Sequence, residues 1–257
     1  MAIVFQIFLV LLLIVIIILF AFRIAREKEN IPLPENYKEL LNDYVKFYRQ
    51  LDEEGKERFE ERVEHFLSAV QITGVNALVE DIDRLLIAAG AIIPVYTIPD
   101  WQYINLHEIL LYPGAFNEDF DQGGSDRPIA GMVGTGVMQH VMIITKWQLR
   151  QGFINNHDAH NTAIHEFVHL IDKMDGTMDG VPEIILERKY VPQWKQLMDT
   201  TIVQMKNYGS DIDIDMYGST NPTEFFAVIS EYFFERPDLL KANHPELYEM
   251  LERIYKR

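Results

Sequence analysis

The chain has 257 residues, with 39 acidic and 23 basic side chains, a net charge of −16 and no cysteine. The lack of cysteine excludes a disulfide scaffold, a thiolate metal site and a cysteine nucleophile. The acidity disfavours non-specific binding to nucleic acid, which requires basic patches against the phosphates. Hydrophobic and charged fractions of 48% and 24% are those of a globular protein.

Residues 1–22 carry no charged side chain, and the run Ile7–Phe22 is entirely apolar. This length matches the roughly 20 residues that a membrane-spanning helix needs. A cleaved signal peptide fits less well, because no basic residue precedes the run, the run is too long and no small-residue cleavage motif follows it. We therefore expect residues 1–22 to be a transmembrane anchor in the lipid bilayer. Basic residues follow it between 23 and 28, so the positive-inside rule places the rest of the chain in the cytoplasm.

The remainder divides into a juxtamembrane linker, residues 23–36, which is polar and contains two prolines, and one domain, residues 37–257. Apolar periodicity predicts helices near 37–70, 78–91, 157–174, 182–208, 221–236 and 244–256. Stretches rich in Ile, Leu, Val and Tyr predict strands over 92–98, 103–112 and 137–145. This order predicts a mostly helical α+β fold with a small, mainly antiparallel sheet, preceded by one transmembrane helix.

A metal-binding pattern lies within one predicted helix, where His165-Glu166-Phe167-Val168-His169 places two histidines at positions i and i+4. Such residues share a helical face, so both imidazoles can reach one metal ion while Glu166 takes a proton from water. Zinc suits these ligands, and a site with three protein ligands keeps one position open for water. The alternative is a chance match in a helical scaffold, but the apolar residues around the motif favour a half-buried helix that holds its ligands rigidly.

Two glutamates compete for the place of the third ligand. Glu187 follows His169 by 18 residues, an interval found in many zinc peptidases with a glutamate ligand. Glu224 lies in the first turn of a helix that Asn221 and Pro222 are expected to begin. A carboxylate on a helix as apolar as this one is costly unless it is paired or metal-bound, which favours Glu224 mildly.

Further acidic and histidine residues have two interpretations each. Asp172, at i+3 from His169, is either an acceptor for the ring N–H of a ligand histidine or a surface aspartate. His157 and His160 suggest a second metal, but a solvent-facing helix N-terminus explains them equally well. The remaining histidines and the alternating aspartates of residues 211–215 are expected to be structural or solvated.

Two blocks, HEFVHLID at residues 165–172 and YGSTNPTEFFAVISEYFF at residues 217–234, resemble the MtfA (Mlc titration factor A) family of zinc-dependent peptidases. The resemblance extends over about residues 37–250. It implies a zincin-like metallopeptidase domain of the gluzincin type.

The same resemblance implies the role of each site residue. It assigns His165, His169 and Glu224 as ligands of Zn²⁺. Glu166 resembles the general base, and the hydroxyl of Tyr217 resembles the group that stabilises the oxyanion, where a neutral donor reinforces the metal.

Two features near the site are expected from position along the chain. Glu231, seven residues after Glu224, is expected either to hold a ligand histidine or to cap a buried network. The strand near 137–145, extended to Trp147, occupies the place where such peptidases carry a strand above the zinc. An extended substrate would pair with its open edge through backbone hydrogen bonds.

The sequence thus predicts a membrane-anchored, cytoplasm-facing zinc metallopeptidase that acts on peptide or protein substrates. The alternative is a membrane-tethered module that captures a regulatory protein partner, with zinc mainly structural. Glu166 between the two histidines favours catalysis, because a structural site has no need of a base there.

Overall fold

The computed structural model describes residues 32–117, 120, 122, 129–134, 136–155, 159–209 and 212–255. The predicted anchor, residues 1–22, and most of the predicted linker lie outside this part of the chain, so both stay predictions. Among the residues that the structure describes, none of the helices combines the length and apolar character needed to span a bilayer. Residues Leu33–Arg257 make up one structural unit.

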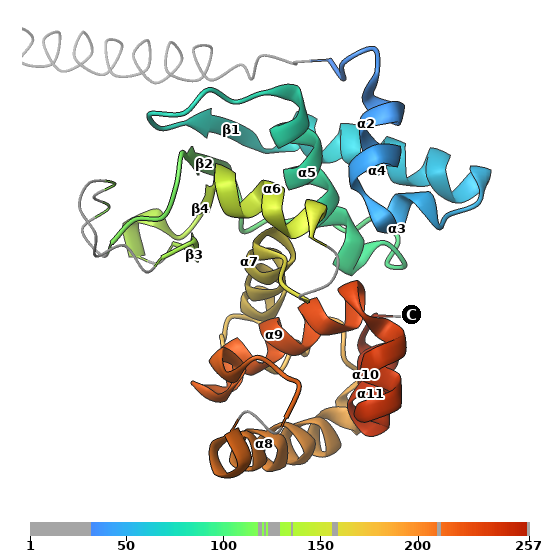
Figure 1. The fold of residues 1–257 in the computed structure, drawn as a ribbon, viewed down its shortest axis with the longest axis vertical. Coiled ribbons are helices and arrows are strands. Elements are labelled where there is room, and N and C mark those ends of the chain that lie inside the picture. Colours follow the sequence, from blue (N-terminus) through green and yellow to red (C-terminus); the bar gives the residue numbers. More distant parts are fainter. Residues whose placement is uncertain are drawn as a thin grey trace, which may run out of the picture. The chain divides into compact units, whose positions relative to one another are not determined.

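Helices make up most of this unit (Figure 1). In chain order the described helices are α2 (Tyr37–Tyr44), α3 (Lys46–Arg49), α4 (Glu53–Ala69), α5 (Asp81–Ile92), α6 (Lys146–Ile154), α7 (Thr162–Asp172), α8 (Val191–Tyr208), α9 (Pro222–Glu235), α10 (Pro237–Asn243) and α11 (Pro245–Tyr255). Short 3-10 turns include η1 (Ile93–Val95), η2 (Gly136–Met138), η3 (Lys173–Asp175), η4 (Arg188–Tyr190) and η6 (Met216–Ser219). The expected mostly helical α+β class is confirmed.

The predicted helix over 37–70 is divided into three. Val45 is extended, with φ −105° and ψ 98°, which separates α2 from α3. The side chain of Asp52 then accepts a hydrogen bond from Gly55 N at 2.8 Å and caps the start of α4. The spacing of apolar residues continues across both boundaries and does not reveal them. The first boundary is the extended Val45, and the second is the cap at Asp52.

The sheet has four strands in the order β1 (Gln71–Gly74), β2 (Glu108–Tyr112), β4 (Val141–Thr145) and β3 (Gly131–Val133). The β1–β2 and β2–β4 pairs are parallel, and only β3–β4 is antiparallel. The expectation of a mainly antiparallel sheet is therefore wrong. The strands β1 and β2 are parallel because the chain crosses over through α5 and returns to the same end of the sheet.

Several predicted strands are wrong or shorter than expected. Residues 92–98 contain the end of α5 and then η1, not a strand. Ile93 and Val95 are buried in this segment. A short buried apolar run has the same pattern in a helix and in a strand, so the sequence did not distinguish them. Of residues 103–112 only β2 is a strand, and of residues 137–145 only β4 is. The predicted extension to Trp147 is wrong because α6 begins at Lys146. Since β4 lies between β2 and β3, it also has no open edge.

Helix α7 lies between α5 and α6 on the sheet side and α9 on the other side (Figure 1). Gly90 of α5 allows close approach, because a Cβ at that position would lie 2.6 Å from Ala163 Cβ of α7. Further along, Phe167 packs its ring 5.6 Å from that of Phe66 and 5.1 Å from that of Tyr103. Dense packing on the sheet side therefore holds α7 in place, as rigid ligand geometry requires.

The segment before η6 is tied down by Asp213. Its carboxylate accepts hydrogen bonds from the Tyr232 hydroxyl, from Asn243 Nδ2 at 2.6 Å and from His244 Nε2 at 2.5 Å. Burial raises the pKa of Asp213, but these hydrogen bonds outweigh burial and lower it to about 2. Asp213 and His244 are thus structural, as expected for His244.

Candidate metal centre

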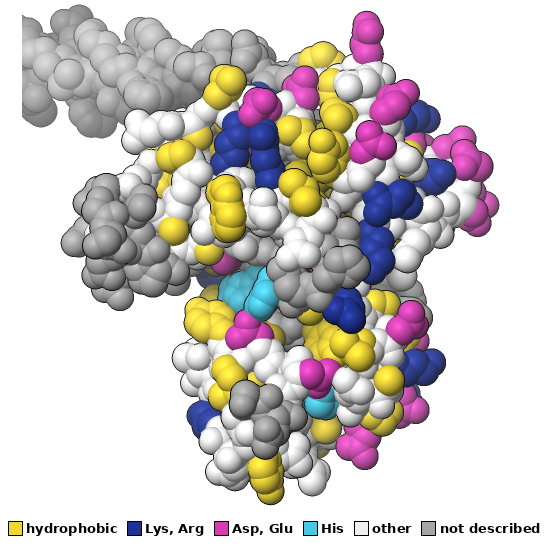
Figure 2. All heavy atoms as spheres, viewed as in Figure 1, with side chains coloured by type: hydrophobic (Ala, Val, Ile, Leu, Met, Phe, Trp, Pro, Cys, Tyr) yellow, Lys and Arg dark blue, Asp and Glu magenta, His cyan; other side chains and the backbone are white. Residues whose placement is uncertain are grey.

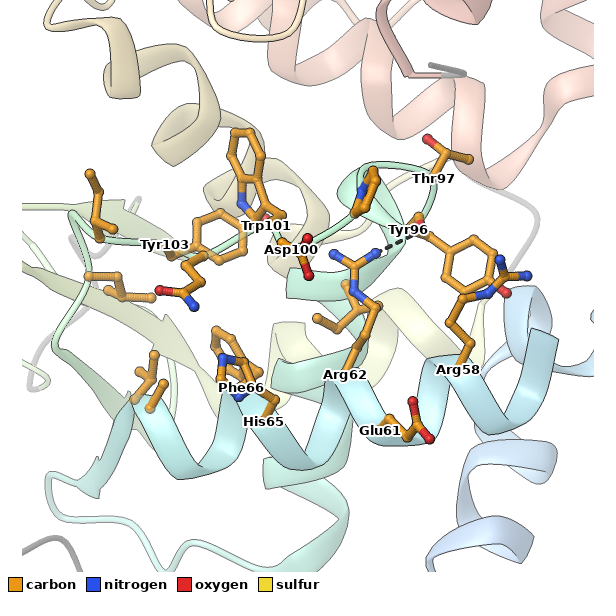
Figure 3. A pocket seen from close by; sticks show the side chains of 17 residues that line it. Arg58, Glu61, Arg62, His65, Phe66, Tyr96, Thr97, Asp100, Trp101 and Tyr103 are labelled. Carbon is orange, nitrogen blue, oxygen red and sulfur yellow. Dashed lines mark hydrogen bonds between the residues drawn. The ribbon is translucent and has the colours of Figure 1, made fainter. Parts of the chain in front are cut away.

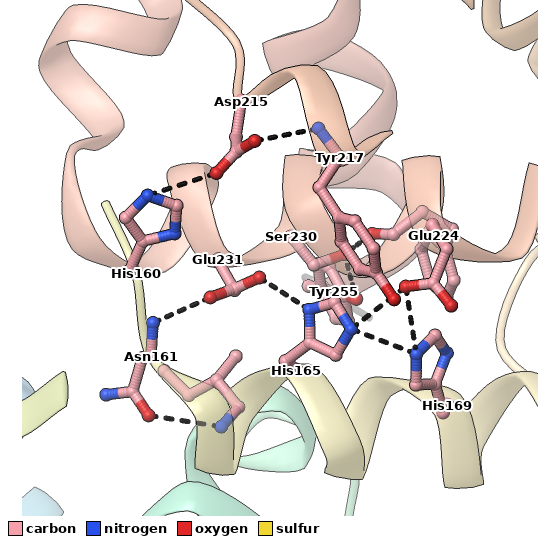
Figure 4. A network of polar contacts seen from close by, with 12 residues as sticks. His160, Asn161, His165, His169, Asp215, Tyr217, Glu224, Ser230, Glu231 and Tyr255 are labelled. Carbon is pink, nitrogen blue, oxygen red and sulfur yellow. Dashed lines mark hydrogen bonds and ion pairs between the residues drawn. The ribbon is translucent and has the colours of Figure 1, made fainter. Parts of the chain in front are cut away.

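The three residues that the resemblance assigns as metal ligands converge where α7 faces α9 (Figure 4). His165 Nε2 lies 3.0 Å from His169 Nε2 and 3.1 Å from Glu224 Oε2. His169 Nε2 lies 3.4 Å from Glu224 Oε2. Tetrahedral bonds of about 2.0–2.1 Å would separate ligand atoms by about 3.4 Å, so this donor set fits one zinc ion.

Two helix caps determine where these ligands project. Asn161 Oδ1 accepts a hydrogen bond from Ile164 N at 3.2 Å and begins α7 one turn before His165. Asn221 Oδ1 accepts from Glu224 N at 3.0 Å and begins α9, with Pro222 at the first helical position as expected from the sequence. The capping residues therefore place ligands from both helices at the same point.

Glu231 of α9 orients the first histidine. Its Oε1 lies 2.6 Å from His165 Nδ1, and its Oε2 accepts a hydrogen bond from Asn161 N at 2.6 Å. Because the carboxylate accepts a hydrogen bond from Nδ1–H, the proton of the neutral ring stays on Nδ1 and the lone pair of Nε2 points toward Glu224 and His169. Both interactions considered for Glu231 are present, since it holds His165, a candidate ligand, and joins a buried network.

The charges around the cluster favour a cation. Burial raises the pKa of Glu224, but its contacts with His165 and His169 lower it to about 2, so this carboxylate is ionised at neutral pH. Burial lowers the pKa of His165, but Glu231 and Glu224 raise it well above its ordinary value. The same negative charge attracts a metal ion, which competes with the proton for Nε2.

Glu166 lies on the sheet side of the cluster, against β3. Its side chain is buried, and its Oε2 has no hydrogen-bond partner among the described residues. Burial raises the pKa of Glu166, which suits a group that takes up and returns a proton. A Cβ at Gly131 of β3 would lie 2.5 Å from Glu166 Oε1, so glycine leaves the room that this carboxylate occupies. No sequence pattern distinguishes Gly131, which is one of several glycines in its segment, so its role emerges only from the structure.

Tyr217 reaches the cluster from η6 and remains 54% exposed. Its ring centroid lies 6.1 Å from that of His165, and Figure 4 shows its hydroxyl directed toward the ligands. Asp215 Oδ1 accepts a hydrogen bond from Tyr217 N at 2.7 Å, and Asp215 Oδ2 lies 3.1 Å from His160 Nε2. Burial together with the charge of Glu224 raises the pKa of Tyr217, so the phenol keeps its proton at neutral pH.

Two alternatives from the sequence take other places. Glu187 is exposed, pairs with Lys189 at 2.8 Å, and is not a member of the ligand cluster. Asp172 is fully buried, so the surface interpretation is wrong, and its Oδ2 accepts a hydrogen bond from Gly180 N at 2.9 Å. His169 Nδ1 and Asp172 Oδ1 each lack a hydrogen-bond partner within the described ranges, so the expected bond between them is not formed.

The space-filling view shows how this part of the molecule meets solvent. Figure 2 shows histidine side chains in a hollow between the region of α5 and α6 and the region of α8 and α9, with acidic and hydrophobic side chains beside them. The side chain of His165 keeps 13% of its surface exposed, and Tyr217 beside it is 54% exposed. The three-residue cluster is therefore reached by solvent on the side of Tyr217.

Comparison with known proteins gives consistent matches over nearly the whole chain. The model of the family described as glucose-regulated metallo-peptidase M90 matches residues 20–256. An uncharacterised protein, slr2042, of Synechocystis sp. is 33% identical over 251 residues, which cover 90% of this chain and 87% of that protein. Mlc titration factor A of Pectobacterium atrosepticum is 29% identical over 221 residues, covering 80% of this chain and 81% of that protein. Mlc titration factor A of Yersinia enterocolitica is 28% identical over 248 residues, covering 90% and 89%.

Proposed function

The chain belongs to the family of glucose-regulated metallopeptidases M90, and from this membership we propose that it is a zinc-dependent peptidase that hydrolyses peptide bonds in peptide or protein substrates. The observation that carries the proposal is the convergence of His165, His169 and Glu224 beside a buried carboxylate. Two imidazole nitrogens and one carboxylate oxygen are the donors of a catalytic zinc site.

The ligand residues would hold the metal through His165 Nε2, His169 Nε2 and a carboxylate oxygen of Glu224. When bound there, zinc supplies the positive charge that polarises a peptide carbonyl and makes water acidic enough to attack at neutral pH. Glu231 keeps His165 in the tautomer that this requires.

Glu166 is proposed as the general base. Its buried Oε2 accepts a proton from the attacking water and then transfers it to the leaving amine nitrogen. Tyr217 is proposed to donate a hydrogen bond from its phenol to the carbonyl oxygen as negative charge develops there. Its raised pKa supports this role, because the donor must be protonated.

The substrate is proposed to lie along β3. Among the described strands, β3 pairs only with β4, and its Gly131 contacts the proposed base. An extended peptide that adds to this edge would place its backbone beside Glu166. The edge predicted for the strand over 137–145 thus belongs to the neighbouring strand.

Residues 1–22 are proposed to anchor the enzyme in a membrane with the peptidase domain in the cytoplasm, on the apolar length and flanking charges described above. A reporter joined to the C-terminus tests this topology, and labelling of that reporter from outside intact cells would contradict it.

The relatives named Mlc titration factor A support a second candidate, a module that binds a regulatory protein while zinc is mainly structural. Turnover separates the two functions. The full-length protein should bind one zinc per chain and cleave members of a mixed peptide library, and a chelator should abolish cleavage. Stoichiometric zinc without cleavage of any peptide would favour the binding module.

The mechanism is tested with three matched Glu→Gln variants. Glu166→Gln should retain zinc and lose activity by at least about 100-fold, the usual contribution of a general base. Glu224→Gln should lose zinc as well, because it removes a ligand. Glu187→Gln, at the rejected ligand position, should keep both. Cleavage by the Glu166→Gln variant at the wild-type rate would refute the proposed base.

A further inference from the structure

A cavity of about 740 Å³, separate from the metal centre, lies between α4 and the segment over residues 96–106 (Figure 3). It shares no lining residue with the metal centre. Two of its lining side chains, Phe66 and Tyr103, pack on Phe167, whereas the neighbouring Glu166 faces the ligand cluster from the same helix. The cavity thus lies behind α7, and its volume is in the range of small-molecule sites.

The cavity contains a guanidinium group with unused hydrogen-bonding capacity. Arg62 Nη1 donates to Val95 O at 2.9 Å and to Tyr96 O at 2.7 Å, which fixes the side chain in place. Its Nη2 is buried and has no hydrogen-bond partner in the described part of the chain. Within that part, no carboxylate lies at ion-pair distance from Arg62 either. A buried donor left unsatisfied costs free energy, and an acceptor brought by a ligand would recover it.

A second donor lines the same cavity. Trp101 Nε1 is buried and, among the described side chains, forms no hydrogen bond. Figure 3 shows the guanidinium of Arg62 and the indole of Trp101 directed into the same cavity. Both groups are donors without acceptor capacity, so the matching ligand atom is an oxygen that accepts. A charged donor favours an anionic oxygen.

The walls require the rest of the ligand to be apolar. Aromatic side chains surround the two donors, and they are Phe66, Tyr96, Trp101 and Tyr103. The rings of Trp101 and Tyr103 meet edge to face at 5.8 Å, so the wall beside the donors is apolar ring surface, which suits a flat apolar body.

The charges along the cavity favour a ligand with one negative charge over a ligand with two. Arg58 and Arg62 supply two positive charges, and Glu61 and Asp100 supply two negative charges. Arg58 already lies over the Tyr96 ring, with 5.3 Å between its guanidinium carbon and the ring centroid. The carboxylates of Glu61 and Asp100 repel any anion in the cavity. This repulsion is twice as large for a dianion, such as a phosphate monoester, as for a carboxylate.

We propose that this cavity binds a small organic monocarboxylate with a flat apolar body, whose carboxylate accepts hydrogen bonds from Arg62 Nη2 and Trp101 Nε1 while its body lies among the aromatic rings.

The test uses the full-length protein and calorimetric titration with 3-phenylpropanoate. Two analogues serve as probes of charge, namely 3-phenylpropanamide, which is neutral, and phenyl phosphate, which carries up to two negative charges. We expect saturable binding of the carboxylate at one site per chain. The amide should bind about tenfold more weakly because it loses a charge-assisted hydrogen bond, and phenyl phosphate should bind about tenfold more weakly because its second charge adds repulsion from Glu61 and Asp100. Equal or tighter binding of either analogue would overturn the proposal.

The variants separate loss of the site from loss of the fold. Arg62→Gln should remove the preference for carboxylate over amide. Its matched control is Arg49→Gln, because Arg49 Nη1 also donates to two carbonyl oxygens, of Asn42 and Asp43, outside the cavity. Trp101→Phe keeps an aromatic, though smaller, ring and removes the N–H, so it should weaken binding of the carboxylate more than binding of the amide even if Arg62→Gln fails to fold. If Trp101→Phe leaves the preference unchanged, or if Arg49→Gln reduces it equally, the assignment is wrong. The Glu166→Gln variant should bind 3-phenylpropanoate as the wild type does, so this test does not depend on peptidase activity.

Discussion

Substitution of Gly131 by alanine should reduce catalysis without removing the metal. A Cβ at this position would lie 2.5 Å from Oε1, 2.8 Å from Cγ and 2.9 Å from Cδ of Glu166. Ordinary contacts of a Cβ begin near 3.4 Å. The carboxylate of Glu166 would therefore have to move by about 0.9 Å, while His165, His169 and Glu224 are not touched.

The size of the effect follows from that displacement. A misplacement of about 1 Å in a reacting group costs on the order of 100-fold in rate, or about 2.7 kcal/mol in the activation barrier. We expect kcat for peptide cleavage to fall by about this factor, with one zinc still bound per chain. A rise in KM alone would instead indicate that the new methyl group obstructs substrate on β3.

The assay compares Gly131→Ala with Gly114→Ala, where a Cβ would have no neighbour within 4 Å. The control should retain wild-type kcat. A double-mutant cycle adds a readout besides activity, because Glu166→Ala removes the clashing atoms. Gly131→Ala should therefore destabilise the wild type more than it destabilises the Glu166→Ala variant in denaturant titrations. A kcat within about twofold of wild type in a zinc-loaded Gly131→Ala protein would refute this reasoning.

Three further predictions concern other parts of the structure. Glu231→Gln should weaken zinc binding by about 10- to 100-fold, because it weakens the hydrogen bond that orients His165, and an unchanged dissociation constant in chelator competition would contradict this. Gly90→Ala should destabilise the fold by about 1–3 kcal/mol, since the added Cβ would lie 2.6 Å from Ala163 Cβ, and chemical denaturation that shows no loss would exclude such close packing. Asp213 should contribute pH-dependent stability: its pKa in the folded protein is about 2, against about 3.9 in an unfolded chain, so the contribution is complete above about pH 5 and is lost as the pH falls toward 2. The side chain is 37% exposed, so solvent screening limits the contribution to about 1 kcal/mol, and the stability difference between wild type and Asp213→Asn should shrink by about half between pH 6 and pH 3.

The ligand-bearing helices are the elements that local sequence determines most fully. The i, i+4 spacing of His165 and His169 places both imidazoles on one face, and Asn221 with Pro222 begins the helix that carries Glu224. Both features act within a few residues, so they can be read before the fold is known. The apolar run over 1–22 is local in the same way, and it stays a prediction of a membrane anchor.

The sheet and the surroundings of the site depend on contacts between distant residues. Strand direction follows from the crossover through α5, and β3 has only three residues, too few for a period to be recognised. Gly131 contacts Glu166, which is 35 positions away in the chain. His165 is hydrogen-bonded to Glu231, which is 66 positions away. No local pattern encodes such pairs.

By itself, then, the sequence determined an acidic, cysteine-free chain in which any metal must be held by nitrogen and oxygen, and it predicted the residues that would supply these atoms. Only the tertiary structure showed that Glu224, rather than Glu187, lies beside the two histidines, because this depends on which helix packs against α7. It also moved the open strand edge from β4 to β3 and brought Arg62 and Trp101 into one cavity behind the metal centre. The physical reason is common to all three, since burial and hydrogen bonding between distant residues are settled by packing rather than by local propensity.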